Sequence, residues 1–140
     1  ASNSAATGCS TDYPMIRLAD VYLMAAEAFL RGGAGISRSE ALGLVNAVRL
    51  RAYNNDESGK ISDSDFNLDF MLDERGRELY LESIRRTDLI RFGKFTSDSY
   101  IWQWKGGVLD GRSVNDKFNI YPIPDTDLTA NPNLSNPQYR

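Results

Sequence analysis

LDERGRELYLESIRRTDLIRFGKF, residues 72–95, places acidic and basic side chains at helical spacing along one stretch. Glu74 stands three residues before Arg77, and Glu82 stands three residues before Arg85. Side chains at this spacing lie on the same side of a helix, where opposite charges neutralise one another. The stretch therefore predicts helices held by ion pairs, and it argues against a catalytic centre here.

Length and composition indicate one ordinary globular domain. The chain has 140 residues, of which 41% are hydrophobic and 25% are charged, and 16 basic against 19 acidic residues give a net charge of −3. This balance is typical of a folded domain. Basic residues are interspersed with carboxylates, so no uncompensated basic stripe is available for a phosphate backbone. We therefore expect no nucleic-acid partner.

The chain has no histidine and one cysteine, Cys9. The commonest general base, the usual zinc ligand and every histidine-dependent triad are therefore missing. We expect no enzyme, no metal and no cofactor. The sequence TGCS at residues 7–10 faintly resembles a lipoprotein cleavage box, but the polar residues 2–4 supply no apolar segment before it, so lipidation of Cys9 is not expected.

The first expected helix follows a small, polar lead-in, residues 1–13. It begins at Pro14, because the first helical turn tolerates the missing donor of proline, and runs to about Arg31. Its polar residues share one narrow line, and the rest of its circumference is apolar. This pattern predicts a helix covered by neighbours on several sides. The polar line is made of Arg17, Asp20, Glu27 and Arg31.

A second helix is predicted after a glycine loop. Ser37 and Glu40 have the spacing of a capping box, which marks a helix start. An i, i+3, i+4, i+7 stripe then predicts the buried face. The stripe consists of Ala41, Leu44, Val45, Val48 and Ala52.

Two further helices are expected, one over residues 67–82 and a short one over 87–92 that stops at a glycine. Gly76 lies on the apolar row of the longer helix, between Leu72 and Leu79. Glycine in a helix interior is unfavourable, so this position indicates the close approach of another backbone.

Residues 96–140 form an irregular tail, because scattered prolines and glycines forbid long regular elements. Its aromatic and apolar residues favour a tail packed onto the helices. The sequence thus predicts an all-α fold, with a helical part over residues 14–95 and an ordered, irregular C-terminal tail.

Five segments, in this order along the chain, together resemble one known family. They are IRLADVYLMAAEA (16–28), NAVRLRA (46–52), LDERGREL (72–79), RTDLIRFG (86–93) and NIYPIPDTDLTANPNLSNPQY (119–139). The first two look like the helical hairpin of SusD/RagB-type nutrient-binding lipoproteins, and the other three resemble the C-terminal signatures of that family.

The resemblance implies a tetratricopeptide-like helical hairpin and a C-terminal SusD/RagB-like domain, a fragment of a larger protein. It also implies a cell-surface, lipid-anchored outer-membrane protein of a Bacteroidetes-type bacterium. Such a protein captures starch-like or other glycans and hands them to a SusC-like TonB-dependent transporter. We expect its lipid anchor and much of its sugar-contacting surface to lie outside this chain.

Tyr100, Trp102 and Trp104 alternate, so in an extended segment their rings would project to one side. Flat aromatic faces backed by hydrogen bonds recognise sugars, but the same residues also suit core packing. WQWKGG, residues 102–107, resembles a scaffold segment of one branch of the family, so both roles stay open. Nearby charged residues are either polar contacts beside such a platform or solubility residues: Lys105, Asp110 and Arg112.

The segment DSDFNLDFMLDE, residues 63–74, imitates the oxygen spacing of an EF-hand calcium loop. Leu68 occupies the sixth position, where the sharp turn requires glycine. A helix start capped by Asp65 or Asn67 explains the segment better, so no calcium site is expected.

Glu74, Glu78 and Glu82 form a row with the spacing of four residues, and glycoside hydrolysis needs two carboxylates at one sugar bond. Arginines within reach lower the pKa of a carboxyl group, which disfavours acid catalysis. We therefore expect structural ion pairs instead. The residues expected in such pairs are Arg17, Asp20, Glu27, Arg49, Glu74, Arg75, Glu78, Arg86 and Asp88.

Two classes of function remain. The first is the scaffold part of a glycan-capturing surface lipoprotein. The second is a tetratricopeptide-like repeat module that binds a peptide or another protein. The NIYPIP and ANPNL segments favour the first, because a free-standing repeat module does not need them.

Overall fold

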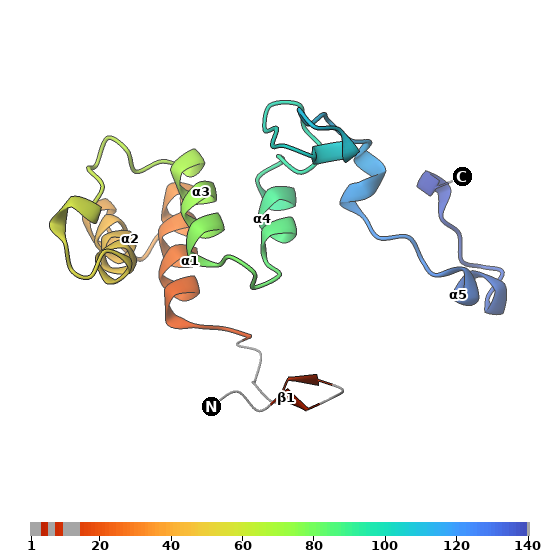
Figure 1. Cartoon of the computed structure of the whole chain (residues 1–140), viewed down its shortest axis with the longest axis horizontal. Helices are drawn as coiled ribbons and strands as arrows, with labels where there is room; N and C mark the ends of the chain where they lie inside the picture. Colours follow the sequence, from red (N-terminus) through yellow and green to blue (C-terminus); the bar gives the residue numbers. More distant parts are fainter. Residues whose placement is uncertain (1–3, 6–7, 10–14, 140) are drawn as a thin grey trace. The chain divides into compact units, whose positions relative to one another are not determined.

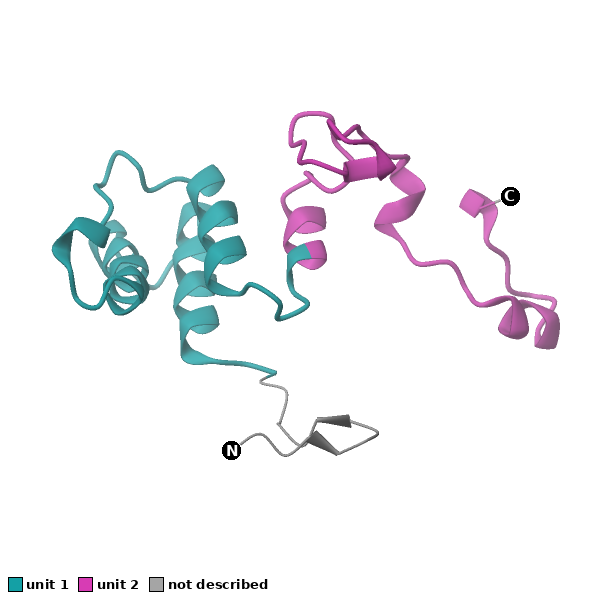
Figure 2. Cartoon of the chain, viewed as in Figure 1, with its two compact units in different colours: residues 1–85 teal, residues 86–140 magenta. Residues whose placement is uncertain are grey.

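The structure, a computed structural model, describes residues 4–5, 8–9 and 15–139. The chain divides into two compact units, residues 1–85 and residues 86–140 (Figure 2). The helices are α1 (Leu18–Leu30), α2 (Arg38–Ala52), α3 (Leu68–Glu78), α4 (Arg85–Arg91) and α5 (Asp125–Ala130) (Figure 1). They confirm the all-α prediction.

Inside the predicted lead-in, two strands of two residues each, β1 (Ser4–Ala5) and β2 (Gly8–Cys9), pair antiparallel with Ser4 opposite Cys9. The other residues of the lead-in lie outside the described part of the chain.

α1 begins four residues later than expected. Arg17 has extended backbone, with φ −132° and ψ 157°, and the helix runs from Leu18 to Leu30. The side chain of Arg17 reaches across to α3 and the residues after it, where it contacts Glu78 and Glu82. Those contacts arise from tertiary packing, so the proline at position 14 could not predict them.

The capping box of α2 is present as predicted. The backbone N–H of Glu40 donates to Ser37 Oγ at 3.2 Å, and the N–H of Ser37 donates to the Glu40 carboxylate at 2.7 Å. Of the predicted apolar stripe, Ala41, Val45 and Val48 are buried, whereas Leu44 is half-buried and Ala52 is exposed.

α3 starts where predicted, because the Asn67 side chain accepts a hydrogen bond from the N–H of Phe70 at 3.0 Å. It ends at Glu78, not near Glu82. Leu81 and Ser83 have positive φ, which ends the helix. The spacing argument that placed Glu82 and Arg85 on one helix face is therefore wrong.

α1 packs against both α2 and α3 in the first unit. The buried apolar side chains of this unit are Leu23, Ala26, Ala41, Val45, Val48, Phe66, Met71, Leu72 and Leu79. The polar line of α1 faces inward, since Asp20 and Glu27 are buried, while Leu18, Val21 and Met24 are exposed. We expected neighbours to cover α1 on several sides, but among the described residues one apolar side of α1 stays exposed.

Gly76 has a close neighbour, but that neighbour is a side chain. A Cβ at Gly76 would lie 2.8 Å from Arg85 Nη1. The same guanidinium donates to the carbonyl of Leu72 at 2.5 Å. The expected backbone approach is therefore wrong, and the missing side chain of Gly76 instead leaves room for the Arg85 guanidinium beside α3.

The second unit has little regular structure besides α4 and α5. Three short 3₁₀ helices cover Lys105–Gly107, Asp116–Asn119 and Pro137–Tyr139. Its end is held by polar contacts, since Tyr139 Oη lies 2.8 and 2.6 Å from the carbonyl oxygens of Lys117 and Ile120, which share its single hydroxyl hydrogen. These contacts order the tail without long elements.

Candidate functional site

The three candidate aromatic residues lie in residues 97–112 of the second unit, a segment that we call the aromatic loop. Tyr100 is half-buried, whereas Trp102 is 39% and Trp104 is 65% exposed. The rings of Tyr100 and Trp102 meet edge to face, with centroids 6.2 Å apart and an interplanar angle of 62°. Such geometry is favourable for an aromatic pair and leaves ring surface available.

The aromatic loop is not the extended strand that simple alternation assumes. Trp104 has left-handed backbone, with φ 67°, and a 3₁₀ helix follows it directly. A bulky residue with positive φ is uncommon, and surrounding contacts must hold it there. Here the N–H of Trp104 donates to the carbonyl of Leu109 at 3.2 Å. An extended segment would project all three rings to one side. Because the backbone is not extended at Trp104, this expectation does not apply to its ring.

Lys105 is buried, at 3% exposure, within the aromatic loop. Its ammonium donates to the carbonyls of Lys94, Ser97 and Tyr100 at 3.2, 2.5 and 2.6 Å. The same nitrogen lies 4.7 Å from the ring centroid of Trp102. An ammonium group has three donors, and all three have acceptors here. Lys105 is therefore an internal cross-link of the loop and not a polar contact for a ligand.

Gly111 closes the aromatic loop against its first half. A Cβ built on Gly111 would lie 2.2 Å from the carbonyl oxygen of Trp102, and its φ is 75°. Both the backbone conformation and the contact require glycine. Arg112 follows, and its N–H donates to the carbonyl of Lys105 at 3.0 Å. The guanidinium of Arg112 donates to the carbonyl of Gly106 at 3.1 Å, so this charge also serves the loop.

Gly111→Ala is expected to loosen the aromatic loop. The left-handed backbone costs an L residue about 1–2 kcal/mol, and the overlap with the carbonyl of Trp102 adds to this cost. Gly107→Ala is the matched control, because Gly107 has φ 77° and open space around its Cβ position. The measurement is the rate of hydrogen exchange in peptides from residues 97–112, which is expected to be faster in Gly111→Ala than in Gly107→Ala. Equal exchange in the two variants would contradict the role of the close contact.

Two clusters of charged residues lie around α3 in the first unit. In the first, Arg75 is 3% exposed, and its Nη1 lies 2.8 Å from Asp20 Oδ1 of α1. Arg75 Nε lies 4.0 Å from Glu27 Oε2, and the other oxygen of Glu27 accepts from Arg31 at 2.8 Å. Buried charges need such partners, since an isolated one is costly. This cluster joins α1 to α3.

The second cluster joins α2 to α3 through the predicted carboxylate row. Arg49 of α2 contacts Glu74 at 2.7 Å, and Arg77 contacts the same carboxylate at 2.7 Å. Glu78 accepts from Arg17 at 2.5 Å and also from Arg51.

Arg17 and Glu82 complete this second cluster. Glu82, the last carboxylate of the row, accepts from the Arg17 guanidinium at 2.7 Å. Hydrogen bonds with Glu82 and Glu78 raise the pKa of Arg17 above its ordinary value, against the opposing effect of burial. Every carboxylate of the row thus has a guanidinium partner, and the arrangement holds helices together.

Arg86 and Asp88 lie at α4. Asp88 is buried and contacts Arg91 at 2.8 Å. Arg86 donates to the carbonyl of Phe118 at 2.6 Å, and its guanidinium lies 3.9 Å from the ring centroid of Tyr121. Arg86 thereby attaches the tail to α4, while its expected ion pair stays a prediction.

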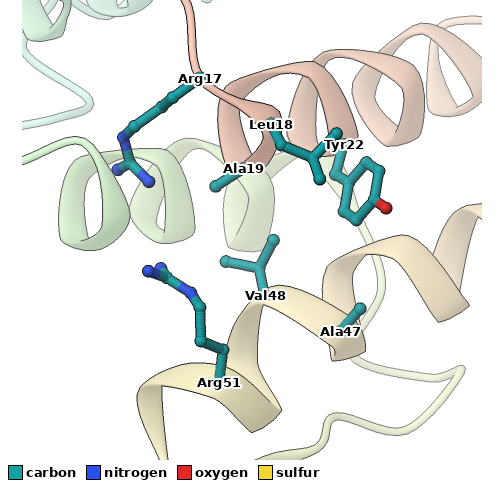
Figure 3. A pocket seen from close by; sticks show the side chains of 7 residues that line it. All are labelled: Arg17, Leu18, Ala19, Tyr22, Ala47, Val48 and Arg51. Carbon is teal, nitrogen blue, oxygen red and sulfur yellow. The ribbon is translucent and has the colours of Figure 1, made fainter. Parts of the chain in front are cut away.

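A groove of about 320 Å³ lies between α1 and α2. Figure 3 shows Arg17 and Arg51 at the same end of the groove, with Leu18 and Tyr22 on the α1 side and Val48 on the α2 side. Both guanidiniums already contact Glu78, so their charges serve the second cluster, and the rest of the groove is mostly apolar.

The segment that imitates a calcium loop is occupied by other partners. Asp63 contacts Arg38 at 2.6 Å, Asn67 caps α3, and Glu74 pairs with arginines. Among the described residues, no group of three or more Asp, Glu or Cys side chains is arranged to hold a metal ion. Within the same part of the chain, every helix is too short or too polar to reach across a bilayer.

Sequence reasoning missed three contributions to these sites. It did not assign Lys105 to the interior of the loop, Arg51 to the cluster at Glu78, or Phe66 to the core. For Phe66 a signal existed, because it directly precedes the Asn67 cap, where an apolar residue packs against the first turns of a helix. For Lys105 and Arg51 the partners are distant in sequence or are backbone carbonyls, which leave no local pattern.

Comparison with known proteins places the chain in a family. Residues 1–139 match the model of the SusD family, whose members are cell-surface outer-membrane lipoproteins that act as binding proteins and not as enzymes. Over 132 aligned residues the chain is 42% identical to "Starch-binding protein SusD" of Bacteroides thetaiotaomicron. The aligned region covers 94% of this chain and 22% of that protein. The chain thus spans about a fifth of the length of this relative. Since the family model covers nearly the whole sequence, the chain belongs to the SusD family.

Proposed function

We propose that this chain is a scaffold part of a cell-surface glycan-binding lipoprotein. The whole protein captures a starch-like or other polysaccharide and delivers it to a SusC-like TonB-dependent transporter in the outer membrane. The single observation that carries this proposal is the 42% identity to a protein named for starch binding, across 94% of the chain. The paired carboxylates around α3 support a scaffold role, since their charges serve interhelical contacts.

Location follows from the same proposal. The protein is held at the cell surface by a lipid anchor at the N-terminus of the whole polypeptide, and the helices described here take no part in crossing the bilayer. Protease treatment of intact cells, followed by detection of this chain, tests surface exposure. Full protection from protease in intact cells would contradict it.

We assign the proposed sugar contact of this chain to Tyr100, Trp102 and Trp104. The exposed indoles of Trp102 and Trp104 offer apolar faces that suit sugar rings. The left-handed backbone at Trp104 adds support, because strained backbone concentrates at functional sites.

The double variant Trp102→Ala with Trp104→Ala is expected to weaken polysaccharide binding by at least about tenfold, as expected for loss of exposed aromatic anchors. The measurement is retardation of the whole parent protein in native gels that contain soluble starch, xylan or a mixed-linkage β-glucan. The expected loss concerns whichever polysaccharide retards the unmodified protein.

Tyr80→Ala is the matched control, because Tyr80 is 74% exposed and lies in the first unit. It is expected to leave retardation unchanged. Normal binding by the double tryptophan variant would assign these residues to the scaffold and place the sugar contacts elsewhere in the parent protein.

The second candidate function is a tetratricopeptide-like module that binds a protein or peptide. The exposed apolar residues Leu18, Val21 and Met24 of α1, together with the groove between α1 and α2, favour it. A parent protein that is retarded by none of the polysaccharides would support this candidate. Retardation by any of them supports the glycan-binding lipoprotein.

A further inference from the structure

We propose that Lys105 is a positioning residue for the aromatic loop: its buried ammonium gathers three backbone carbonyls and thereby fixes Trp102 and Trp104 in the arrangement that contacts a neutral polysaccharide. The inference rests on the proposed function, because it concerns the same sugar-contacting surface. It adds a residue that touches no ligand itself.

The Lys105 ammonium is surrounded by backbone carbonyls. Lys94, Ser97 and Tyr100 present their carbonyl oxygens to Nζ of Lys105 from three points spread over seven residues. Three carbonyl dipoles that converge in a buried place repel one another and need a shared donor. The cation supplies that donor, so the path of the backbone from Lys94 to Tyr100 depends on it.

Lys105 also contacts the indole-bearing residues. The N–H of Lys105 donates to the carbonyl of Trp102 at 3.1 Å, and the ammonium lies against the ring of Trp102, 4.7 Å from its centroid. Trp104 directly precedes Lys105 and has the left-handed backbone described above. The side chain of Lys105 therefore contacts both the segment before Trp102 and the ring of Trp102. The backbone of Lys105 is bonded directly to Trp104.

Lys105 has no donor left for direct contact with a ligand. The ammonium is buried, and its three donors already have acceptors. Burial also lowers the pKa of the Lys105 amine below its ordinary value, an effect that nearby Asp98 partly opposes. Arg112 also donates to the loop, through its Nε to the carbonyl of Gly106. The Lys105 ammonium is thus not available to pair with an acidic sugar, which agrees with a neutral polysaccharide as the ligand.

The test uses Lys105→Met in the whole parent protein, which keeps the side-chain length and removes the donors. Retardation by soluble starch, or by the polysaccharide of the panel that retards the unmodified protein, is expected to weaken by at least about tenfold. The tryptophan fluorescence spectrum is expected to change as well, because a cation leaves the face of Trp102. Lys60→Met, at an exposed lysine of the first unit, is the control and is expected to change neither.

A double-variant cycle separates positioning from general damage. In a Trp102→Phe background, Lys105→Met is expected to cost clearly less binding than in the unmodified protein, because the two residues act through one surface. Lys105→Gln, which keeps two donors without a charge, repeats the cycle if the methionine variant does not fold. Additive losses of Lys105 and Trp102 in either cycle would overturn the inference.

Two further outcomes distinguish its failure from that of the proposed function. Normal retardation of Lys105→Met, together with loss of retardation in the double tryptophan variant, would overturn the inference alone. Normal retardation of both variants would overturn the inference and the proposed sugar contact together.

Discussion

Replacing Arg75 by methionine is expected to lower the free energy of unfolding by about 3–5 kcal/mol. Arg75 is buried in α3 and faces Asp20 and Glu27 of α1. Without its guanidinium, two buried carboxylates lose a positive partner, and neither is free to move into water while α1 stays packed. The loss therefore separates α3 from α1.

Urea unfolding of the parent protein, together with hydrogen exchange of peptides from α1 and α3, measures this effect. Arg77→Met is the matched control, because Arg77 lies two residues away on α3 with a side chain that is 54% exposed. Exposed ion pairs contribute about 0–1 kcal/mol. The interpretation fails if the two arginine variants destabilise α3 equally.

A compensated variant isolates the cause. Combining Arg75→Met with Asp20→Leu and Glu27→Met removes all three charges and keeps the volume apolar. Replacement of a whole buried ionic cluster by apolar residues is often neutral or stabilising. We therefore expect the triple variant to regain most of the stability that Arg75→Met loses. If the triple variant is no more stable than the single one, lost packing and not unpaired charge explains the effect.

Phe66→Ala is expected to cost about 3–5 kcal/mol, the range for truncation of a buried phenylalanine. Phe66 is 1% exposed, and the Arg38 guanidinium lies 5.3 Å from its ring centroid. It precedes the Asn67 cap, and Met71 occupies the position four residues into α3, where such an apolar residue packs. The substitution therefore frees the start of α3, the helix that carries both charged clusters.

The same unfolding and exchange measurements apply to Phe66. Phe66→Leu is expected to cost less than about 1.5 kcal/mol, since it keeps an apolar side chain of nearly the same size. Tyr80→Ala, at an exposed aromatic residue, is expected to stay within about 0.5 kcal/mol of the unmodified protein. A cost for Phe66→Ala as small as that for Tyr80→Ala would show that α3 does not depend on this anchor.

The helix signals that rest on neighbouring residues predicted the structure well. The capping box of Ser37 and Glu40 and the Asn67 cap are both present, and the stripe of α2 contains its three buried residues. The errors lie at helix ends and at glycine contacts. α3 stops before Glu82 because Leu81 and Ser83 adopt positive φ, which no residue type there announces.

In the candidate site, the residue types were predictable but their arrangement was not. Alternation identified Tyr100 and Trp102, whose rings do meet, but Trp104 departs from an extended path. The reason is the folding of residues 105–112 back onto the segment before them, through Lys105 and Gly111. Such contacts depend on the whole loop.

By itself, the sequence determined the four longer helical segments, the caps that start α2 and α3, the lack of histidine-based chemistry, and the family that the chain resembles, but it missed the short helix α5 and the start of α1. These properties depend on residue types and on spacings of three or four positions. Tertiary structure alone decided the partner of each charge, such as Arg75 with Asp20 and Arg17 with Glu82, and the burial of Lys105. The physical reason is that helical periodicity is a local property, whereas an ion pair between helices exists only after packing has brought distant residues within a few ångströms.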